Sequence, residues 1–343
     1  MAGQYNVTRH VDEKPVGKAG ASVSIDMPRA YDQRYWIIEL FGTIHVESIG
    51  GSGDNVKTTA HGVASQISNI EVRANGRQSI FNVPFTYLVL GRHEDYGVGG
   101  TDQSMTTING LGDGSNVVAG VTYDVKAVGF IQFDTVDGER PKDSSLATNQ
   151  MNMFQLIATW GNPADLFALD SDPVTVTRDL TMRVSISETV ELVDPKTGTR
   201  SYPQLLRKVT AIHQPVNATN RAQQIVLPTS NSMKSITVMA MDENGNYADG
   251  IVTELAAKSG LDTRFQVAAD TMLLDNRAKY GNRLPGVITL DFTRVDGPAR
   301  LADCWNLTSQ AQPVLELGVV NNTAQPRYVD VICVEYLALG SGM

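Results

Sequence analysis

The strongest pattern along the chain is an alternation of apolar and polar residues between Val174 and Leu192. Every second residue from Val174 onward is apolar except Arg178 and Glu188, whereas the intervening residues are all polar. This two-residue period indicates a β-strand with one buried and one solvated face. The run exceeds the usual strand length, so the pattern allows two strands broken near Arg178 and Asp179.

Shorter runs of strand-like sequence predict further strands on both sides of this one, and the dipeptide Asn75-Gly76 predicts a hairpin turn after one of them. We expect these strands at residues 35–47, 70–74, 121–136, 208–212, 224–227, 235–241, 287–294, 314–320 and 328–339.

Helical signals are confined to two short segments. Residues 84–93 have a proline in the first turn, and residues 270–280 begin with Asp270 as N-cap and are followed by Gly281. The polar, glycine-rich stretches 91–120 and 242–265 are predicted to be long loops that form subunit contacts and the exterior surface.

The length of 343 residues suits about two domains of roughly 150 residues each. We expect a polar N-terminal arm at 1–18, either disordered or ordered on assembly, and a first domain at 19–193. The turn-rich segment 194–203 is expected to be a linker, and the second domain is expected at 204–343.

The two halves repeat one another in order. The repeat rests on three matched pairs and on a glutamate, Glu188 or Glu335, in the closing strand of each half. The matched pairs are 69–74 with 235–240, 129–134 with 286–291, and 136–138 with 295–297.

The predicted fold class follows from this repeat. Each half has about eight strand-like runs and few helices, and valine, isoleucine and threonine are abundant. We therefore predict an all-β protein built from two tandem eight-stranded jelly-roll β-sandwiches, with a few short helices in loops.

Charge and cysteine content exclude several functions. The net charge of −9 argues against a broad nucleic-acid-binding surface. Cys304 and Cys333 belong to no zinc-binding cluster, and Cys333 is expected to be a small buried thiol. No signal peptide or membrane-spanning run is present, so we expect synthesis in the cytoplasm.

No catalytic motif occurs among the candidate residues. The five histidines, His10, His45, His61, His93 and His213, form no metal-binding pair, and no P-loop or nucleophile elbow is found. The segment 242–246 has some residues of a calcium-binding loop, but its glycine is misplaced and the twelfth position is Thr253. We expect a plain turn there and no cofactor, although calcium bound between subunits stays open.

The chain resembles a known family, the double jelly-roll major capsid proteins of tailless, membrane-containing icosahedral bacteriophages of the tectivirus and corticovirus type. The resemblance lies in Ile-Ser-Asn-Ile-Glu-Val-Arg-Ala-Asn-Gly at 67–76, in the helix-bearing stretch 268–281 before Val287, and in the layout of residues 20–343.

The resemblance implies a homotrimer whose six rolls form a pseudo-hexagonal capsomer. Such capsomers tile an icosahedral virion shell, around an internal lipid membrane and with separate vertex (penton) and minor capsid proteins. An N-terminal arm on the inner side would place Lys14 and Lys18 near anionic lipid. Synthesis in a bacterial host cytoplasm is also implied.

Two other classes of protein fit the same pattern. A tandem β-sandwich that binds carbohydrate, or a phage spike, would use Trp36, Trp160 and Trp305 as exposed platforms, although core positions suit tryptophan better. An enzyme on a jelly-roll scaffold would need a histidine cluster or paired carboxylates, which the sequence does not indicate.

Overall fold

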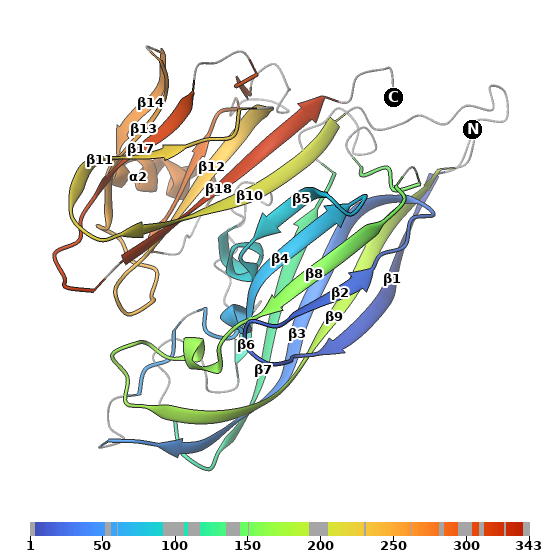
Figure 1. The fold of residues 1–343 in the computed structure, drawn as a ribbon, viewed down its shortest axis with the longest axis vertical. Helices are drawn as coiled ribbons and strands as arrows, with labels where there is room; N and C mark the ends of the chain where they lie inside the picture. Colours follow the sequence, from blue (N-terminus) through green and yellow to red (C-terminus); the bar gives the residue numbers. More distant parts are fainter. Residues whose placement is uncertain are drawn as a thin grey trace.

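The chain forms two β-sandwiches that lie side by side (Figure 1). The computed structural model describes residues 4–51, 56–59, 61–91, 106–108, 117–134, 145–149, 151–191, 205–229, 231–260, 262–280, 285–293, 304–308, 312–325 and 327–338. The expected linker 194–203 lies outside these residues, so that boundary stays a prediction.

The first sandwich, roll 1, consists of a five-stranded sheet in the order β1-β9-β3-β7-β6, packed on strands in the order β5-β4-β8-β2. Its strands are β1 (Gln4–Pro15), β2 (Ser22–Asp26), β3 (Asp32–Ile49), β4 (Ile67–Ala74), β5 (Gln78–Val83), β6 (Thr106–Ile108), β7 (Thr122–Gln132), β8 (Phe154–Trp160) and β9 (Val174–Glu191).

The second sandwich, roll 2, consists of strands in the order β15-β12-β18-β10, with β16 attached to β12, packed on a sheet in the order β11-β17-β13-β14. Its strands are β10 (Leu205–Val216), β11 (Asn220–Val226), β12 (Ser232–Met241), β13 (Val252–Ser259), β14 (Asp262–Ala268), β15 (Val287–Asp291), β16 (Trp305–Asn306), β17 (Pro313–Val319) and β18 (Arg327–Ala338).

The two rolls repeat one strand order. The sheet β1-β9-β3-β7 corresponds to β10-β18-β12-β15, and β2-β8-β4-β5 corresponds to β11-β17-β13-β14. Eight strands wound in this order into two facing sheets make a jelly roll. The predicted fold class, two tandem eight-stranded jelly rolls, is therefore confirmed.

One of the matched pairs that indicated the repeat is wrong. Residues 69–74 lie in β4, whose partner by topology is β13, whereas residues 235–240 lie in β12. Both segments are buried strands with similar apolar spacing, so a short match does not separate them. The pair 129–134 with 286–291 is correct in topology, because β7 and β15 correspond. Residues 136–138 and 295–297 lie outside the described residues.

The expected N-terminal arm is also corrected. Gln4–Pro15 form β1, which pairs antiparallel with β9 from Gln4 opposite Glu191 to Pro15 opposite Thr181. This segment is the first strand of roll 1 and not an arm outside it. Its polar sequence is typical of an edge strand, which has only one neighbour.

Strand β9 is continuous and unbroken at Arg178 and Asp179. It is held on both sides, by β1 and by β3, and this double pairing sustains its length. The expected loop at 242–265 is wrong from Val252 onward, because β13 and β14 occupy that part. Of the expected loop 91–120, most lies outside the described residues.

Both predicted helical segments are present. Helix α2 (Ala269–Tyr280) packs on β15, where Asn276 Nδ2 donates to the Thr289 carbonyl at 2.8 Å and Asn276 Oδ1 accepts from the Thr289 amide at 2.6 Å. The described part of the other segment includes a single π-helical turn, η2 (Tyr87–Gly91). The hairpin between β4 and β5 turns at Asn75 and Gly76, whose φ angles are 50° and 71°.

The rolls share one central sheet. Strands β5 and β10 pair in parallel, Val209 opposite Phe81 and Thr210 opposite Asn82, so nine strands from both rolls form one sheet. Strands β12 and β18 are buried on both faces. One face, including Val238 and Val331, belongs to the core of roll 2, and the other joins the core of roll 1. The joint between the rolls is therefore a hydrophobic interface.

Candidate functional site: the seam between the rolls

A cavity of about 550 Å³ lies at this seam. Roll 1 contributes the segment before β4, the start of β4, the end of β5 with the residues that follow it, and the loop after β8. Roll 2 contributes β10, β18 and the loop after β12. The side chains used below are His61, Asp165 and Leu169 of roll 1 and His213, Tyr247 and Asp330 of roll 2. We call it the seam cavity.

The loop after β12 locks the rolls together beside the seam cavity. The Tyr247 ring packs against His61, with ring centroids 4.6 Å apart, and its hydroxyl hydrogen-bonds with Thr86. In addition, the Leu169 amide donates to the Asn244 carbonyl at 3.2 Å. Each contact joins roll 2 to roll 1, so the seam is fixed by polar as well as apolar contacts.

His61 is a buried histidine in the cavity wall, and only 7% of its surface is exposed. Burial lowers its pKa to about 4, so the ring is neutral at neutral pH. Its Nδ1 has no hydrogen-bond partner within the part of the chain that the structure describes. A buried polar atom without a hydrogen-bond partner is rare in folded proteins and lowers their stability, so His61 is an unusual residue of this wall.

His213 and Asp330 form the only ion pair found between cavity-lining side chains among the described residues. They face each other across β10 and β18, and His213 Nδ1 lies 2.7 Å from Asp330 Oδ1. This hydrogen bond raises the pKa of His213. The imidazole also stacks on Tyr328 at 5.0 Å.

Arginines anchor the loops at one end of each roll. In roll 1, Arg178 donates to Gln66 Oε1 at 2.7 Å, to the Gly161 carbonyl at 2.8 Å and to the Gly17 carbonyl at 2.8 Å. These contacts tie together the loops after β1 and β8 and the start of β4. Arg178 is thus a loop anchor, although it interrupts the apolar face of β9.

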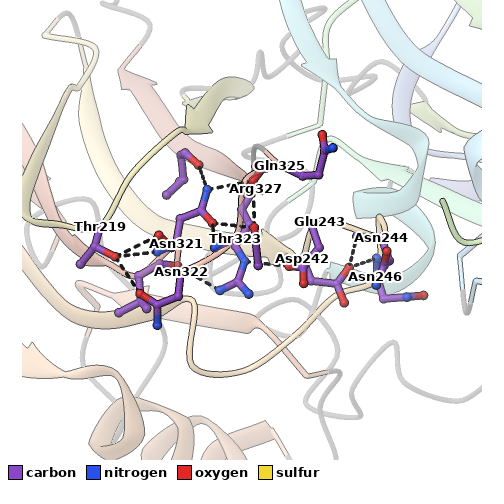
Figure 2. A network of polar contacts seen from close by, with 12 residues as sticks. Thr219, Asp242, Glu243, Asn244, Asn246, Asn321, Asn322, Thr323, Gln325 and Arg327 are labelled. Carbon is purple, nitrogen blue, oxygen red and sulfur yellow. Dashed lines mark hydrogen bonds and ion pairs between the residues drawn. The ribbon is translucent and has the colours of Figure 1, made fainter. Parts of the chain in front are cut away.

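Roll 2 has a related anchor, which Figure 2 shows within a network of polar side chains. Arg327 donates to Glu243 Oε2 at 2.9 Å and to the Val320 carbonyl at 3.0 Å. Val320 follows β17 as Gly161 follows β8, so the two arginines bind equivalent carbonyl groups. Asn321 extends the network by donating to the Val216 carbonyl at 2.7 Å.

The predicted turn at Asp242 belongs to the same network. Asp242 Oδ1 accepts from the backbone amides of Asn244 at 2.9 Å and Asn246 at 2.8 Å, and Gly245 has a φ of 82° (Figure 2). The carboxylate is thus bonded to its own loop, as expected for a turn. Among the described residues, no group of three or more histidine, cysteine or acidic side chains is arranged to hold a metal ion.

At the opposite end of each roll lies a buried glutamate. Glu188 in β9 accepts from Gln33 Nε2 at 2.7 Å and pairs with Arg9 at 2.9 Å. Glu335 in β18 accepts from Asn231 Nδ2 at 3.1 Å, and Lys208 Nζ lies 3.7 Å away. Burial raises the pKa of Glu335. Both glutamates thus have one amide and one cation as neighbours, which supports the predicted repeat.

The structure disperses the remaining sequence candidates. His10 is exposed on β1, His45 bonds to Thr122 at 2.9 Å, and His93 lies outside the described residues. Both cysteines are buried and neither forms a disulfide, which confirms the expectation for Cys333, and burial raises the pKa of its thiol.

All three tryptophans, Trp36, Trp160 and Trp305, are buried core residues, as the sequence favoured. Lys14 pairs with Asp12 at 2.8 Å, and Lys18 is exposed in the turn after β1. The described part of the chain contains no helix with the length and hydrophobicity needed to cross a bilayer.

The sequence does not predict the seam cavity. Its lining comes from short segments far apart in the chain, such as His61, Asp165 and Tyr247. The one available signal was the apolar run at residues 331–334 of β18, which is typical of a strand buried on both faces.

Comparison with known proteins supports the fold independently. The major capsid protein of Sulfolobus Turreted Icosahedral Virus (STIV) is 16% identical, with a TM-score of 0.72 over 97% of this chain and 97% of that one. The PBCV-1 virus capsid protein is 15% identical, with a TM-score of 0.64 over 98% and 94%. The major capsid protein P2 of bacteriophage PM2 is 14% identical, with a TM-score of 0.56 over 98% and 99%. No family model and no curated protein sequence matches the chain. At these identities the likeness establishes the double jelly-roll fold.

Proposed function

We propose that this chain is the major capsid protein of an icosahedral virus and acts as a shell-building subunit, not as an enzyme. The observation that carries the proposal is the full-length likeness to three capsid proteins, which includes both rolls and their order. Folds host many functions, so the proposal also rests on what this chain contains. In the part of the chain that the structure describes, arginines anchor loops and buried glutamates have polar partners. These contacts hold the loops and strands in place, as a rigid building block requires.

The proposed assembly is a homotrimer. Two rolls of one topology, fused through the central sheet, give each subunit two similar lobes. Three such subunits around a threefold axis present six lobes, which is a pseudo-hexagonal tile. We also propose that these trimers contact neighbouring capsomers and separate vertex and minor capsid proteins. The resulting shell encloses an internal membrane, and the protein is synthesised in a bacterial cytoplasm.

The proposed membrane contact of Lys14 and Lys18 gains no support from their placement. Lys14 lies opposite Met182, ten residues along β1 from Gln4, or roughly 33 Å at strand spacing. If the start of β1 faces the shell interior, both lysines lie toward the other end of roll 1. Co-sedimentation of wild type and a K14E/K18E variant with anionic vesicles tests the contact.

The shell role is tested by the oligomeric state and by microscopy. Size-exclusion chromatography with light scattering is expected to give three times 37.1 kDa or larger assemblies, and negative-stain images are expected to show hexagonal particles. A monomer that persists at high protein concentration would contradict the proposal. Adding Ca²⁺ or a chelator to the same samples tests the prediction that no cofactor is needed.

The carbohydrate-binding alternative loses its main support, because all three tryptophans are in the core. A glycan array separates the two functions. Specific glycan binding by a monomeric protein would favour the binding module or spike.

A further inference from the structure

One sheet of roll 2 is covered on its outer face by roll 1 of the same chain. Met239, Val287 and Ile332 belong to the sheet β10-β18-β12-β15 but are buried in the core cluster of roll 1. Roll 1 reaches this sheet through β5, which pairs with β10, and through the segment after β5, where Thr86 hydrogen-bonds with Tyr247. One edge of roll 1, β5 and the residues that follow it, thus docks on this sheet.

The corresponding sheet of roll 1, β1-β9-β3-β7, has an apolar strip on its outer face. Ile37 and Phe41 of β3 and Val128 of β7 alternate with core residues along their strands, so they lie on that face, and each is half-buried. A sheet face that meets only water usually carries polar side chains. We call these three residues the open face, which β9 borders with serine and threonine side chains.

Roll 2 has an edge that corresponds to the docking edge of roll 1. Strand β14 corresponds to β5, and among the described strands it pairs only with β13. Helix α2 follows β14 and contacts β15, as η2 follows β5 and contacts β7. On α2, Met272 and Leu273 are buried, whereas Leu274 between them and solvent is 70% exposed. We call β14 and α2 the free edge.

The repeat relates the two surfaces. Within one chain the edge of roll 1 covers the sheet of roll 2, so the same contact made by the free edge would cover the open face. The strands that limit these surfaces, β14 and β1, lie on opposite sides of the chain (Figure 1). One chain therefore does not make this contact with itself, whereas two copies placed head to tail do.

We propose that the open face of roll 1 binds the free edge of roll 2 of a second copy of this chain, in the arrangement that joins the two rolls within one chain. The inference rests on the proposed shell role and names the surfaces of its homotrimer. A head-to-tail contact either closes into a ring or continues as a filament. Three such contacts close a ring in which roll 1 and roll 2 alternate.

One substitution on each surface tests the contact. Val128→Glu on the open face and Leu274→Glu on the free edge are each expected to convert the wild-type assembly into a monomer of 37.1 kDa, because either change places a charge in the contact. Val226→Glu is the matched control, since Val226 is an exposed apolar residue of roll 2, 56% exposed, on the opposite edge strand β11. This control is expected to assemble like the wild type. Light scattering after size exclusion measures all four proteins.

Mixing the two variants tests the head-to-tail arrangement. Val128→Glu keeps an intact free edge and Leu274→Glu keeps an intact open face, so an equimolar mixture at high protein concentration is expected to form pairs of twice 37.1 kDa that cannot close a ring. Native mass spectrometry with one isotope-labelled variant identifies the mixed pair.

The outcomes separate this inference from the shell role. A wild-type trimer together with assembly of the folded variants, or with no mixed pair, would overturn the proposed contact and leave the shell role standing. A wild-type monomer at high concentration contradicts the shell role itself. Melting temperature identifies a variant that does not fold, and Leu274→Glu, on a side chain that is mostly exposed, decides the contact if Val128→Glu unfolds.

Discussion

Glu188 and Glu335 occupy corresponding strands of the two rolls, but they are expected to affect the stability of the folded chain in opposite directions. Glu188 has a close charged partner, since Arg9 lies 2.9 Å away, and Gln33 satisfies its other oxygen. Glu335 is fully buried, its Oε2 has no hydrogen-bond partner among the described residues, and Lys208 is 3.7 Å distant. A buried charge that is incompletely paired destabilises the folded state, whereas a well-paired one is costly to remove.

The glutamine variants of these two residues are expected to shift stability in opposite directions. Glu188→Gln loses the ion pair with Arg9, which is half-exposed, and should cost about 1–3 kcal/mol. Glu335→Gln keeps an acceptor for Asn231 and removes the buried charge, so it should raise the melting temperature at about pH 7.5.

The pH dependence of Glu335→Gln follows from linkage. Burial raises the pKa of Glu335 in the folded chain, so the folded state binds this proton more tightly than the unfolded state. Wild-type stability therefore falls as the pH rises from the unfolded pKa through the folded pKa. The advantage of the variant should be present at about pH 7.5 and vanish near pH 4. Melting curves at both pH values check this, and a loss of stability at pH 7.5 would contradict it.

At the scale of elements, β9 connects both ends of roll 1 through Arg178 and Glu188, the two polar residues on its otherwise apolar face. Arg178 anchors three loop segments near the start of the strand, and Glu188 binds β1 and the start of β3 near its end. The residues between them supply the apolar core face. One strand thus fixes both ends of the roll and its interior.

Removing the arginine anchor should destabilise roll 1 more than removing another arginine of the same strand. Arg178→Met loses three hydrogen bonds, two of them to backbone carbonyls, and should cost about 2–4 kcal/mol. Arg183→Met, on the solvated face, loses only exposed ion pairs with Glu13 and Glu39 and should lower the melting temperature much less. Thermal denaturation of both variants compares them, and equal effects would argue against the anchor.

The success of sequence reasoning varied between elements for physical reasons. Strand β9 was predictable because one face is core and the other is solvent, so its period is undisturbed. Strand β1 was missed because an edge strand can be polar on both faces. Strand β13 was missed because Glu254, two alanines and Lys258 have low β-propensity, and its pairing with β14 and β17 overrides that preference.

At the scale of the whole molecule, the central sheet joins the two rolls through a shared hydrophobic core. Strands β12 and β18 are covered by the strands of roll 2 on one face and by roll 1 on the other. Residues 331–334 of β18 are all apolar in the sequence, but a run without alternation does not say what covers each face. That is why two rolls were predictable, whereas their shared core and the seam cavity were not.

Roll 2 alone is therefore expected to fail as an independent domain. A fragment of residues 205–343 would expose Val209, Met239, Ile332 and Val334, which belong to the core shared with roll 1. A contiguous apolar surface of this kind drives association and binds hydrophobic dyes. The fragment should aggregate and enhance the fluorescence of such a dye, whereas the intact chain should not.

A matched fragment identifies the cause of that aggregation. Replacing Val209 and Ile332 by serine changes only the face toward roll 1, since these residues do not belong to the core cluster of roll 2. This fragment should be more soluble and bind less dye, although the same substitutions in the intact chain should destabilise it by several kcal/mol because they bury hydroxyl groups in the shared core. If the unmodified fragment is monomeric, folded and free of dye binding, the two rolls are independent domains. The shared core would then contribute only to their placement and not to their folding.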